Sequence, residues 1–235
     1  MTAITAGGII AAGEGSRLRS LGMPKPLVSV AGEPLLAHVL KNFAAAGITP
    51  VSVIFNGEEE DCAAFVREHF AELVRTVLVK TTDSSLESFQ AILACSPPGR
   101  LLISTVDAFC PPEDFVAFAR AAENAPEGAT VLAVTPLIAD EKPLWVRLDS
   151  DGRVTRVGGS SGDAVTAGIY AVAPAVRDLK PPAPRGSLRE FLSWLCAAGH
   201  AMSGVAMPRV IDVDRPEDLR LAEDMVREAA GARVR

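Results

Sequence analysis

Short apolar runs alternate along the chain with amphipathic segments. The runs are typical of buried parallel strands, while apolar residues at helical spacing in the intervening segments predict helices that cover a sheet. In residues 34–46, for example, Leu36, Val39 and Leu40 fall on one side of a helix and Lys41 on the other. The expected strands are 4–11, 51–55, 76–80, 101–106 and 130–135. The expected helices are 34–46, 58–70, 85–94 and 112–123.

The second half of the chain departs from this alternation of strands and helices. Asp151-Gly152 stands between two β-rich runs in residues 144–157, which predicts a hairpin. Residues 167–174 predict one more strand, and residues 210–226 predict a strand that enters a long helix. The stripe expected on the buried side of that helix is Leu219, Ala222, Met225, Val226 and Ala229. We expect a single α/β domain over residues 1–235, with a mixed, mainly parallel sheet in a three-layer αβα arrangement.

Composition narrows the classes of function. The net charge of −6 argues against a uniformly basic nucleic-acid surface. The four cysteines, which show no C-x-x-C spacing, predict separate reduced thiols rather than a zinc site. No apolar run approaches the ~18 residues of a membrane helix, and the N-terminus lacks a basic segment of the signal-peptide kind. We therefore expect a soluble, cytoplasmic protein that does not bind membranes.

The stretch GIIAAGEGSR, residues 8–17, places two glycines directly after the first apolar run. It is not a Walker A loop, because no lysine follows either glycine, and it fails the G-x-G-x-x-G fingerprint, because Leu18 holds the third position. Such a loop can still turn backbone N–H groups toward an anion, with Arg17 as a forked donor and Lys25 as a point charge. The alternative is a plain turn with solvated cations. We favour an anion site because the apolar run, the two glycines, Arg17 and Lys25 occur together in one short stretch of the sequence.

Residues 8–27, together with VAGEPLLAHVLKNFAAAGI at 30–48, resemble the nucleotidyltransferases that make nucleotide sugars and related activated metabolites. The resemblance implies the Rossmann-like fold of the nucleotide-diphospho-sugar transferases. It also implies that Arg17 holds the β- and γ-phosphates of an NTP and that Lys25 neutralises the α-phosphate. The residues implied to contact the nucleotide through their backbone are Ala11, Ala12, Gly13 and Gly15.

Ser84 and Ser85 allow two interpretations. Ser84-x-x-Glu87 fits a capping box at a helix start, and this role alone is enough to explain the sequence. The resemblance implies in addition that this turn lies against the nucleobase and ribose. Both interpretations stay open at this stage.

The same resemblance implies a Mg²⁺ site. Its first ligand would be Asp107, at the end of the strand expected over residues 101–106, and its second would be an aspartate near the C-terminus. Asp214 and Glu217 have capping-box spacing around a proline, so we expect Asp214 to be a helix N-cap. Asp212 is therefore the preferred second ligand, and Asp214 is the fallback.

The expected reaction is NTP plus a phosphorylated acceptor giving an NDP-linked product and pyrophosphate, with residues 1–110 binding the NTP and 111–235 the acceptor. Sugar-phosphate members of the family carry a lysine after the central hairpin, but residues 157–172 contain none. Lys142 precedes the hairpin, and we expect it to be an exposed or edge residue. A polyol, amino-alcohol or unusual sugar phosphate therefore fits as acceptor. The alternatives are a molybdenum-cofactor type of nucleotidyltransferase and a non-catalytic nucleotide-binding relative, and a homo-oligomer remains open.

Overall fold

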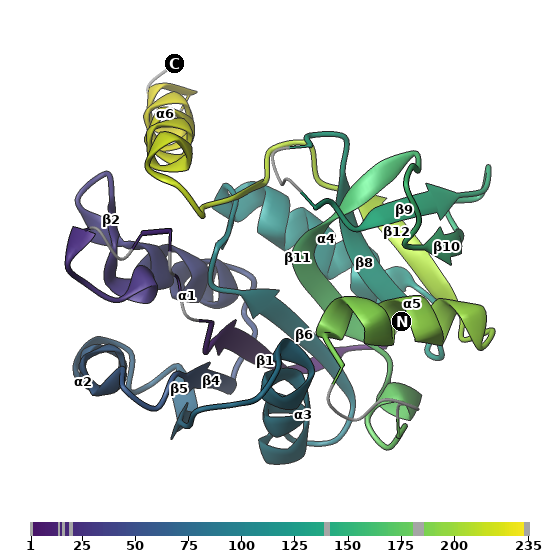
Figure 1. Cartoon of the computed structure of the whole chain (residues 1–235), viewed down its shortest axis with the longest axis horizontal. Coiled ribbons are helices and arrows are strands. Elements are labelled where there is room, and N and C mark those ends of the chain that lie inside the picture. The colour runs from purple at the N-terminus through teal and green to yellow at the C-terminus, as the bar shows by residue number, and fades with distance from the viewer. Residues whose placement is uncertain are drawn as a thin grey trace.

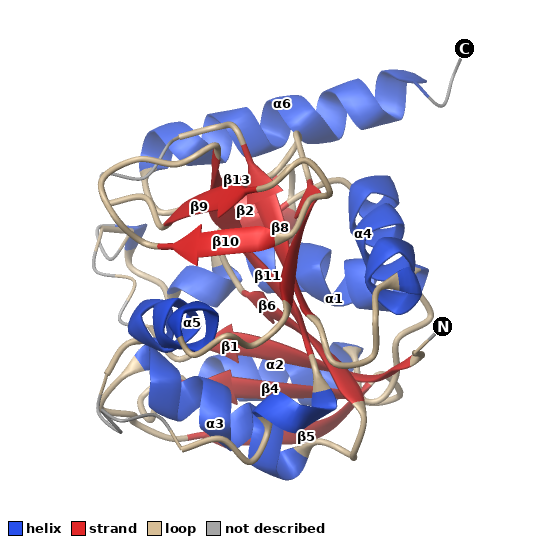
Figure 2. Cartoon of the chain, turned by 90° about the vertical axis from the view of Figure 1, so that its right-hand side faces the viewer, coloured by secondary structure: helices blue, strands red, loops and turns tan. Residues whose placement is uncertain are grey.

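A mixed β-sheet forms the centre of the molecule (Figures 1 and 2). The computed structural model describes residues 2–13, 15, 17, 18, 21–138, 142–180 and 186–232. Within these residues the main sheet has nine strands in the order β10-β9-β11-β6-β1-β4-β5, and β8 joins it between β11 and β12. The strands are β1 Ile4–Ala11, β4 Val51–Phe55, β5 Val74–Val79, β6 Arg100–Thr105, β8 Thr130–Thr135, β9 Trp145–Leu148, β10 Val154–Val157, β11 Ala164–Val172 and β12 Met202–Ala206.

The strand directions confirm a mixed, mainly parallel sheet. β1 runs parallel to β4 and β6, β4 runs parallel to β5, and β8 runs parallel to β12. β11 runs antiparallel to β6, β8 and β9, and β10 runs antiparallel to β9. β11 and β10 therefore oppose the common direction of the other strands, and the β9–β10 pair is the predicted hairpin.

Helices cover both faces of the sheet, so the three-layer arrangement is also confirmed (Figure 2). The helices α1, α2 and α4 pack into one apolar core, whereas α3 and α5 pack into the core on the opposite face. The helix α6 lies at the edge of the molecule against β2 and β13. Their bounds are α1 Leu35–Ala45, α2 Glu60–His69, α3 Ser85–Cys95, α4 Pro112–Asn124, α5 Leu188–Ala197 and α6 Pro216–Ala232.

Two short antiparallel pairs hold segments beside the main sheet. β2 Ser29–Val30 pairs with β3 Glu33–Pro34, and β7 Ala108–Phe109 pairs with β13 Ile211–Asp212. The second pair joins the loop after β6 to the chain that leads into α6. It therefore carries a C-terminal segment to the end of the parallel strands.

Two glycines in β1 allow helices to approach the central strand from both sides. A Cβ atom at Gly7 would lie 2.6 Å from ring carbons of Phe43 in α1, and one at Gly8 would lie 2.4 Å from Cγ2 of Ile92 in α3. Both distances are too short for real contacts, so only glycine permits this packing. Helices held this close on both faces fix the position of the loop that follows the strand.

The predicted elements of the first half agree with the structure to within a few residues. The strands over 4–11, 51–55 and 130–135 have the predicted bounds, and β5 begins two residues earlier than expected. Four residues of the stripe predicted on α6 are confirmed, because Ala222 is fully buried and Leu219, Met225 and Val226 pack against the same cluster, which does not include Ala229. The helix α5 and the strand β12 were not predicted.

Candidate active site

The loop after β1 folds back onto Lys25. Gly15 has a φ of +54°, and a Cβ there would lie 2.8 Å from Cβ of Lys25. The N–H of Leu18 donates to the carbonyl oxygen of Gly15 at 3.0 Å, which closes the turn. Glu14 and Ser16 lie outside the described residues. Glycine at position 15 thus allows both the left-handed backbone and the close contact with the lysine.

Lys25 forms the centre of a charged cluster. Its buried Nζ donates to Oδ2 of Asp107 at 2.7 Å and also to Oδ1 of Asp214. Arg17 donates to the other oxygen of Asp214 at 3.1 Å. These residues come from the loop after β1, the short turn Lys25–Leu27, the end of β6 and the segment before α6.

Electrostatics keep Lys25 and Asp107 ionised. Burial alone would lower the pKa of Lys25, but the charges and hydrogen bonds of Asp107 and Asp214 raise that pKa above its usual value. Burial would likewise raise the pKa of Asp107, and the neighbouring Lys25 ammonium lowers it below the usual range. Lys25 and Asp107 therefore form a charged pair at neutral pH.

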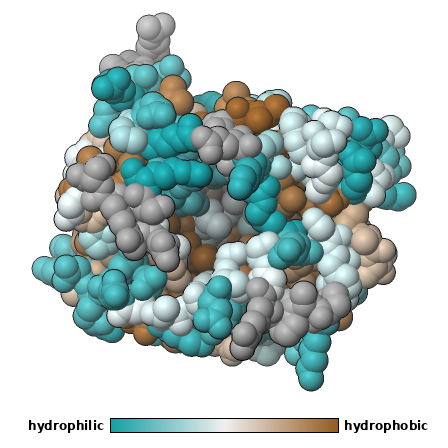
Figure 3. All heavy atoms as spheres, viewed as in Figure 1, coloured by the Kyte–Doolittle hydropathy of each residue, from teal (hydrophilic) through white to brown (hydrophobic). Residues whose placement is uncertain are grey.

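A cavity of about 510 Å³ opens beside this cluster. Figure 3 shows the molecule hollowed near the centre of this face, with mostly hydrophilic side chains around the opening. The cavity wall brings together the predicted nucleotide-site residues with Asp107 and Asp214: Ala11, Ala12, Gly13, Gly15, Arg17, Lys25, Ser84, Ser85, Asp107 and Asp214. Segments that are far apart in the sequence thus meet at the carboxyl ends of β1 and β6, where ligands bind in open α/β sheets.

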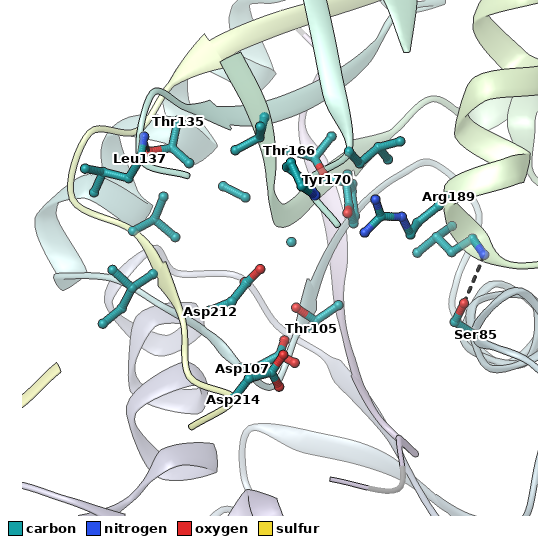
Figure 4. A pocket seen from close by; sticks show the side chains of 18 residues that line it. Ser85, Thr105, Asp107, Thr135, Leu137, Thr166, Tyr170, Arg189, Asp212 and Asp214 are labelled. Atoms are coloured by element: carbon teal, nitrogen blue, oxygen red, sulfur yellow. Dashed lines mark hydrogen bonds between the residues drawn. The ribbon is translucent and has the colours of Figure 1, made fainter. Parts of the chain in front are cut away.

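A second cavity of about 270 Å³ adjoins the first (Figure 4). Ser85, Thr105, Asp107 and Asp214 line both cavities, so the two meet at the charged cluster. Asp212 lines only the second cavity, together with residues that the sequence did not single out: Thr135, Thr166, Tyr170 and Arg189. Burial raises the pKa of Tyr170, so its hydroxyl is a neutral donor or acceptor at this wall.

The predicted N-cap role of Asp214 is wrong. The helix α6 begins at Pro216, and Oδ2 of Asp218 accepts from the N–H groups of Arg215 at 2.8 Å and Asp214 at 3.0 Å. Asp218, one position after Glu217, thus satisfies the amides of the two residues that precede the helix. The carboxylate of Asp214 instead pairs with Lys25 and Arg17, contacts that local sequence reasoning did not include.

The donor set near the two cavities fits Mg²⁺ chemistry. Asp107, Asp212 and Asp214 all present carboxylates to the second cavity, and β13–β7 pairing sets Asp212 opposite Ala108, the neighbour of Asp107. Among the described residues, no cluster of three or more acidic, histidine or cysteine side chains is arranged to hold a metal ion. Mg²⁺ commonly uses one or two carboxylates and takes its other ligands from water and phosphates. Two aspartates therefore suit a metal that arrives with a triphosphate.

The two predicted serines have different contacts. Oγ of Ser84 accepts from the N–H of Glu87 at 3.2 Å, so its role as the N-cap of α3 is confirmed. Oγ of Ser85 accepts from the N–H of Leu188 at 3.0 Å, which ties the start of α3 to the start of α5. Ser85 therefore links the helix beside the nucleotide cavity to the helix beside the second cavity.

A signal for α5 was present in the sequence. Ser187 and Glu190 form both halves of a capping box, and apolar residues recur behind it at helical spacing: Leu188, Phe191, Leu192 and Leu195. Arg189 occupies the first turn of this helix. Lys142 is exposed, as expected, and its backbone carbonyl accepts a hydrogen bond from Arg189.

Comparison with known proteins identifies the class of protein that this fold and cleft define, a nucleotidyltransferase. A family model described as a MobA-like NTP transferase domain matches residues 7–195, and the chain belongs to that family. The resemblance drawn from residues 8–48 is thereby confirmed. Members of this family generally use a divalent metal.

Relatives support the same class. The chain is 32% identical over 231 residues to a bifunctional IPC transferase and DIPP synthase from Rubrobacter xylanophilus, covering 93% of this chain and 51% of that protein. It is 25% identical over 245 residues to mannose-1-phosphate guanylyltransferase 1 from Arabidopsis thaliana, covering 96% of this chain and 67% of that protein. The chain thus spans about half the length of the first relative and about two thirds of the second.

The fold also matches solved structures. The inositol-1-phosphate CTP transferase from T. maritima superposes with a TM-score of 0.82 at 18% sequence identity, covering 96% of this chain and 98% of the other. At this identity the match establishes the fold alone. Within the described ranges, none of the helices has the length and apolar character needed to cross a membrane.

Proposed function

We propose that this chain transfers a nucleoside monophosphate from an NTP to a phosphorylated acceptor and releases pyrophosphate, in a metal-dependent reaction. The observation that carries the proposal is the meeting of two cavities at the cluster of Lys25, Asp107 and Asp214. Transfer requires two substrates side by side with charge stabilisation between them. A cleft with two compartments and an ion cluster at their junction meets that requirement.

The larger cavity is assigned to the NTP. Gly13 and Gly15 leave backbone N–H groups of the loop accessible to phosphate, and Arg17 supplies a forked cation for the β- and γ-phosphates. Ser84 and Ser85 also line this cavity, and the ribose and base are assigned to them. In this assignment residues 1–110 supply most of the nucleotide site, and Asp214 is contributed by the C-terminal half.

The smaller cavity is assigned to the acceptor, which brings its own nucleophile. The second pKa of a phosphate monoester is ~6, so the group is mostly dianionic at neutral pH and needs no residue to remove a proton. One of its oxygens attacks the α-phosphorus in line, the bond from that phosphorus to the bridging oxygen breaks, and pyrophosphate leaves. Lys25 stabilises the charge that builds on the α-phosphate oxygens.

Asp107 and Asp212 would hold the Mg²⁺ ion. When bound, this ion supplies positive charge against the phosphate oxygens. Asp107 already lies at the junction of the two cavities and Asp212 on the wall of the smaller one. Asp214 is assigned to orienting Lys25 and Arg17, with metal ligation as its fallback role.

The acceptor class follows from the relatives and from the wall of the cavity. Relatives are named for inositol 1-phosphate and mannose 1-phosphate, both hydroxyl-rich phosphate esters. The second cavity presents the hydroxyls of Thr135, Thr166 and Tyr170, which can pair with such hydroxyl groups. A polyol or sugar phosphate is therefore proposed, and the cytoplasmic location expected from the sequence stays a prediction.

The test is a matrix of the four NTPs against a panel of acceptors, read by pyrophosphate release. The panel contains inositol 1-phosphate, mannose 1-phosphate, an amino-alcohol phosphate and the pterin phosphate of molybdenum cofactor. We expect release with a polyol or sugar phosphate and one preferred NTP. Nucleotide binding without release for any pair would instead favour a non-catalytic relative, and release with the pterin alone would favour the molybdenum-cofactor type.

A further inference from the structure

The wall of the second cavity carries more negative than positive side chains. Asp107, Asp212 and Asp214 contribute three carboxylates, and Arg189 is the sole cation among the described residues that line it. A phosphate dianion that enters this cavity is repelled by the carboxylates unless positive groups offset them. Lys25, on the wall of the neighbouring cavity, is already shared by two of these aspartates. The Mg²⁺ ion assigned to Asp107 and Asp212 would offset part of this negative charge, and a cation on the acceptor's own side would further favour binding of the phosphate.

Arg189 lies on the wall of the second cavity, in the first turn of its helix. The capping box of Ser187 and Glu190 fixes the first turn of α5, and the N–H of Leu188 donates to Ser85, which borders both cavities. The Arg189 guanidinium lies across the second cavity from Asp212, on the side of Thr166 and Tyr170 (Figure 4). The start of a helix thus fixes the backbone of Arg189, and its guanidinium also donates to the carbonyl oxygen of Lys142.

We propose that Arg189 binds the phosphate of the acceptor through the oxygens that do not attack the nucleotide. This inference rests on the proposed function and names the residue that performs its acceptor-binding step. A guanidinium is suited to the task because its parallel N–H groups match two phosphate oxygens. Residues 157–172, which cross the same side of the molecule, contain no lysine that could take this part.

Phosphate binding tests the inference without knowledge of the acceptor. Wild-type protein saturated with a non-hydrolysable NTP analogue, which fills the first cavity, is titrated with inorganic phosphate by calorimetry. We expect Arg189→Gln to weaken phosphate binding by at least about tenfold, because a charged hydrogen bond is lost. The matched control is Arg147→Gln, which removes an exposed cation that lines neither cavity. Absence of phosphate binding in the wild type, or equal binding by the two variants, overturns the inference.

Kinetics separate this inference from the proposed function. With an acceptor that supports pyrophosphate release, Arg189→Gln should raise KM for the acceptor at least about tenfold and leave KM for the NTP unchanged. Arg189→Lys should recover part of the loss, since it restores the charge but not the fork. Failure of the wild type to release pyrophosphate with any acceptor counts against the proposed function. An unchanged acceptor KM in an active Arg189→Gln enzyme counts against Arg189 alone.

Discussion

Lys25 is the residue on which the proposed chemistry depends most. Its ammonium is buried between Asp107 and Asp214, so Lys25→Ala removes the cation nearest to the proposed α-phosphate and leaves two carboxylates facing each other. We expect kcat to fall on the order of 10³-fold. Pyrophosphate release measures the loss, and circular dichroism establishes that the variant is folded.

The matched control for Lys25 is Lys41→Ala. Lys41 is an exposed lysine of α1 that pairs with Glu33 and lines neither cavity. Its removal should leave kcat within about twofold of the wild type, since exposed ion pairs contribute little. Wild-type turnover in a folded Lys25→Ala protein would remove Lys25 from the mechanism.

The two loop glycines should respond differently to the same substitution. At Gly15 an alanine meets a positive φ and the Lys25 side chain, so Gly15→Ala should lower the free energy of unfolding by about 1–2 kcal/mol and reduce kcat. At Gly13 an added Cβ meets no atom within 4 Å, and the residue lines the nucleotide cavity. Gly13→Ala should therefore keep its stability within about 0.5 kcal/mol and raise KM for the NTP. Urea unfolding and steady-state kinetics compare the two variants. Equal losses of unfolding free energy would contradict the different roles given to the two glycines.

At the scale of elements, two arginines bind carbonyl oxygens at the ends of helices. Arg100, the first residue of β6, is fully buried and donates to the carbonyl oxygens of Ala122 in the last turn of α4 and of Pro126 and Glu127 just beyond it. Arg177 binds carbonyl oxygens at the end of α3 in the same manner. The last carbonyls of a helix lack partners within the helix, and a guanidinium there satisfies them and interacts favourably with the helix dipole.

Removal of Arg100 should therefore destabilise the fold. Arg100→Met keeps apolar volume but leaves buried carbonyls without donors, which costs about 3 kcal/mol of unfolding free energy. Arg67→Met on α2 serves as the comparison, because Arg67 is exposed and pairs with the exposed Glu60. Its effect should stay within about 0.5 kcal/mol. Similar unfolding free energies for the two variants, measured in urea, would refute the structural role of Arg100.

The elements that the sequence predicts well are those whose burial is local and periodic. The central strands are continuous apolar runs. Ser84 caps α3 by accepting a hydrogen bond from Glu87, only three positions away. The capping pattern around Asp214 failed because its partner Lys25 lies 189 residues earlier in the chain. The sequence did not single out Arg189, because its place beside the second cavity depends on the contact between Leu188 and Ser85, 103 residues apart. Local spacing predicts helices and caps, but it cannot predict which distant charge competes for a carboxylate.

The fold of the whole molecule brings segments from both halves of the chain together at one site. The predicted metal ligands Asp107 and Asp212 approach each other because β7 pairs with β13, which leads into α6. The proposed NTP half and acceptor half therefore share the metal site, and neither half holds both carboxylates. This arrangement makes the metal the link between nucleotide binding and acceptor binding, so metal dependence tests the architecture as well as the chemistry.

Activity should accordingly vanish with EDTA and return with Mg²⁺, and the two C-terminal aspartates should differ in how they affect this dependence. Asp212→Asn removes a predicted ligand and should raise the Mg²⁺ concentration for half-maximal activity at least about tenfold. Asp214→Asn removes the partner of Lys25 and Arg17, so it should lower kcat while changing the Mg²⁺ dependence little. Titration of pyrophosphate release with Mg²⁺ distinguishes them. The opposite pattern would assign the metal to Asp214, and activity indifferent to the chelator would exclude the proposed metal site.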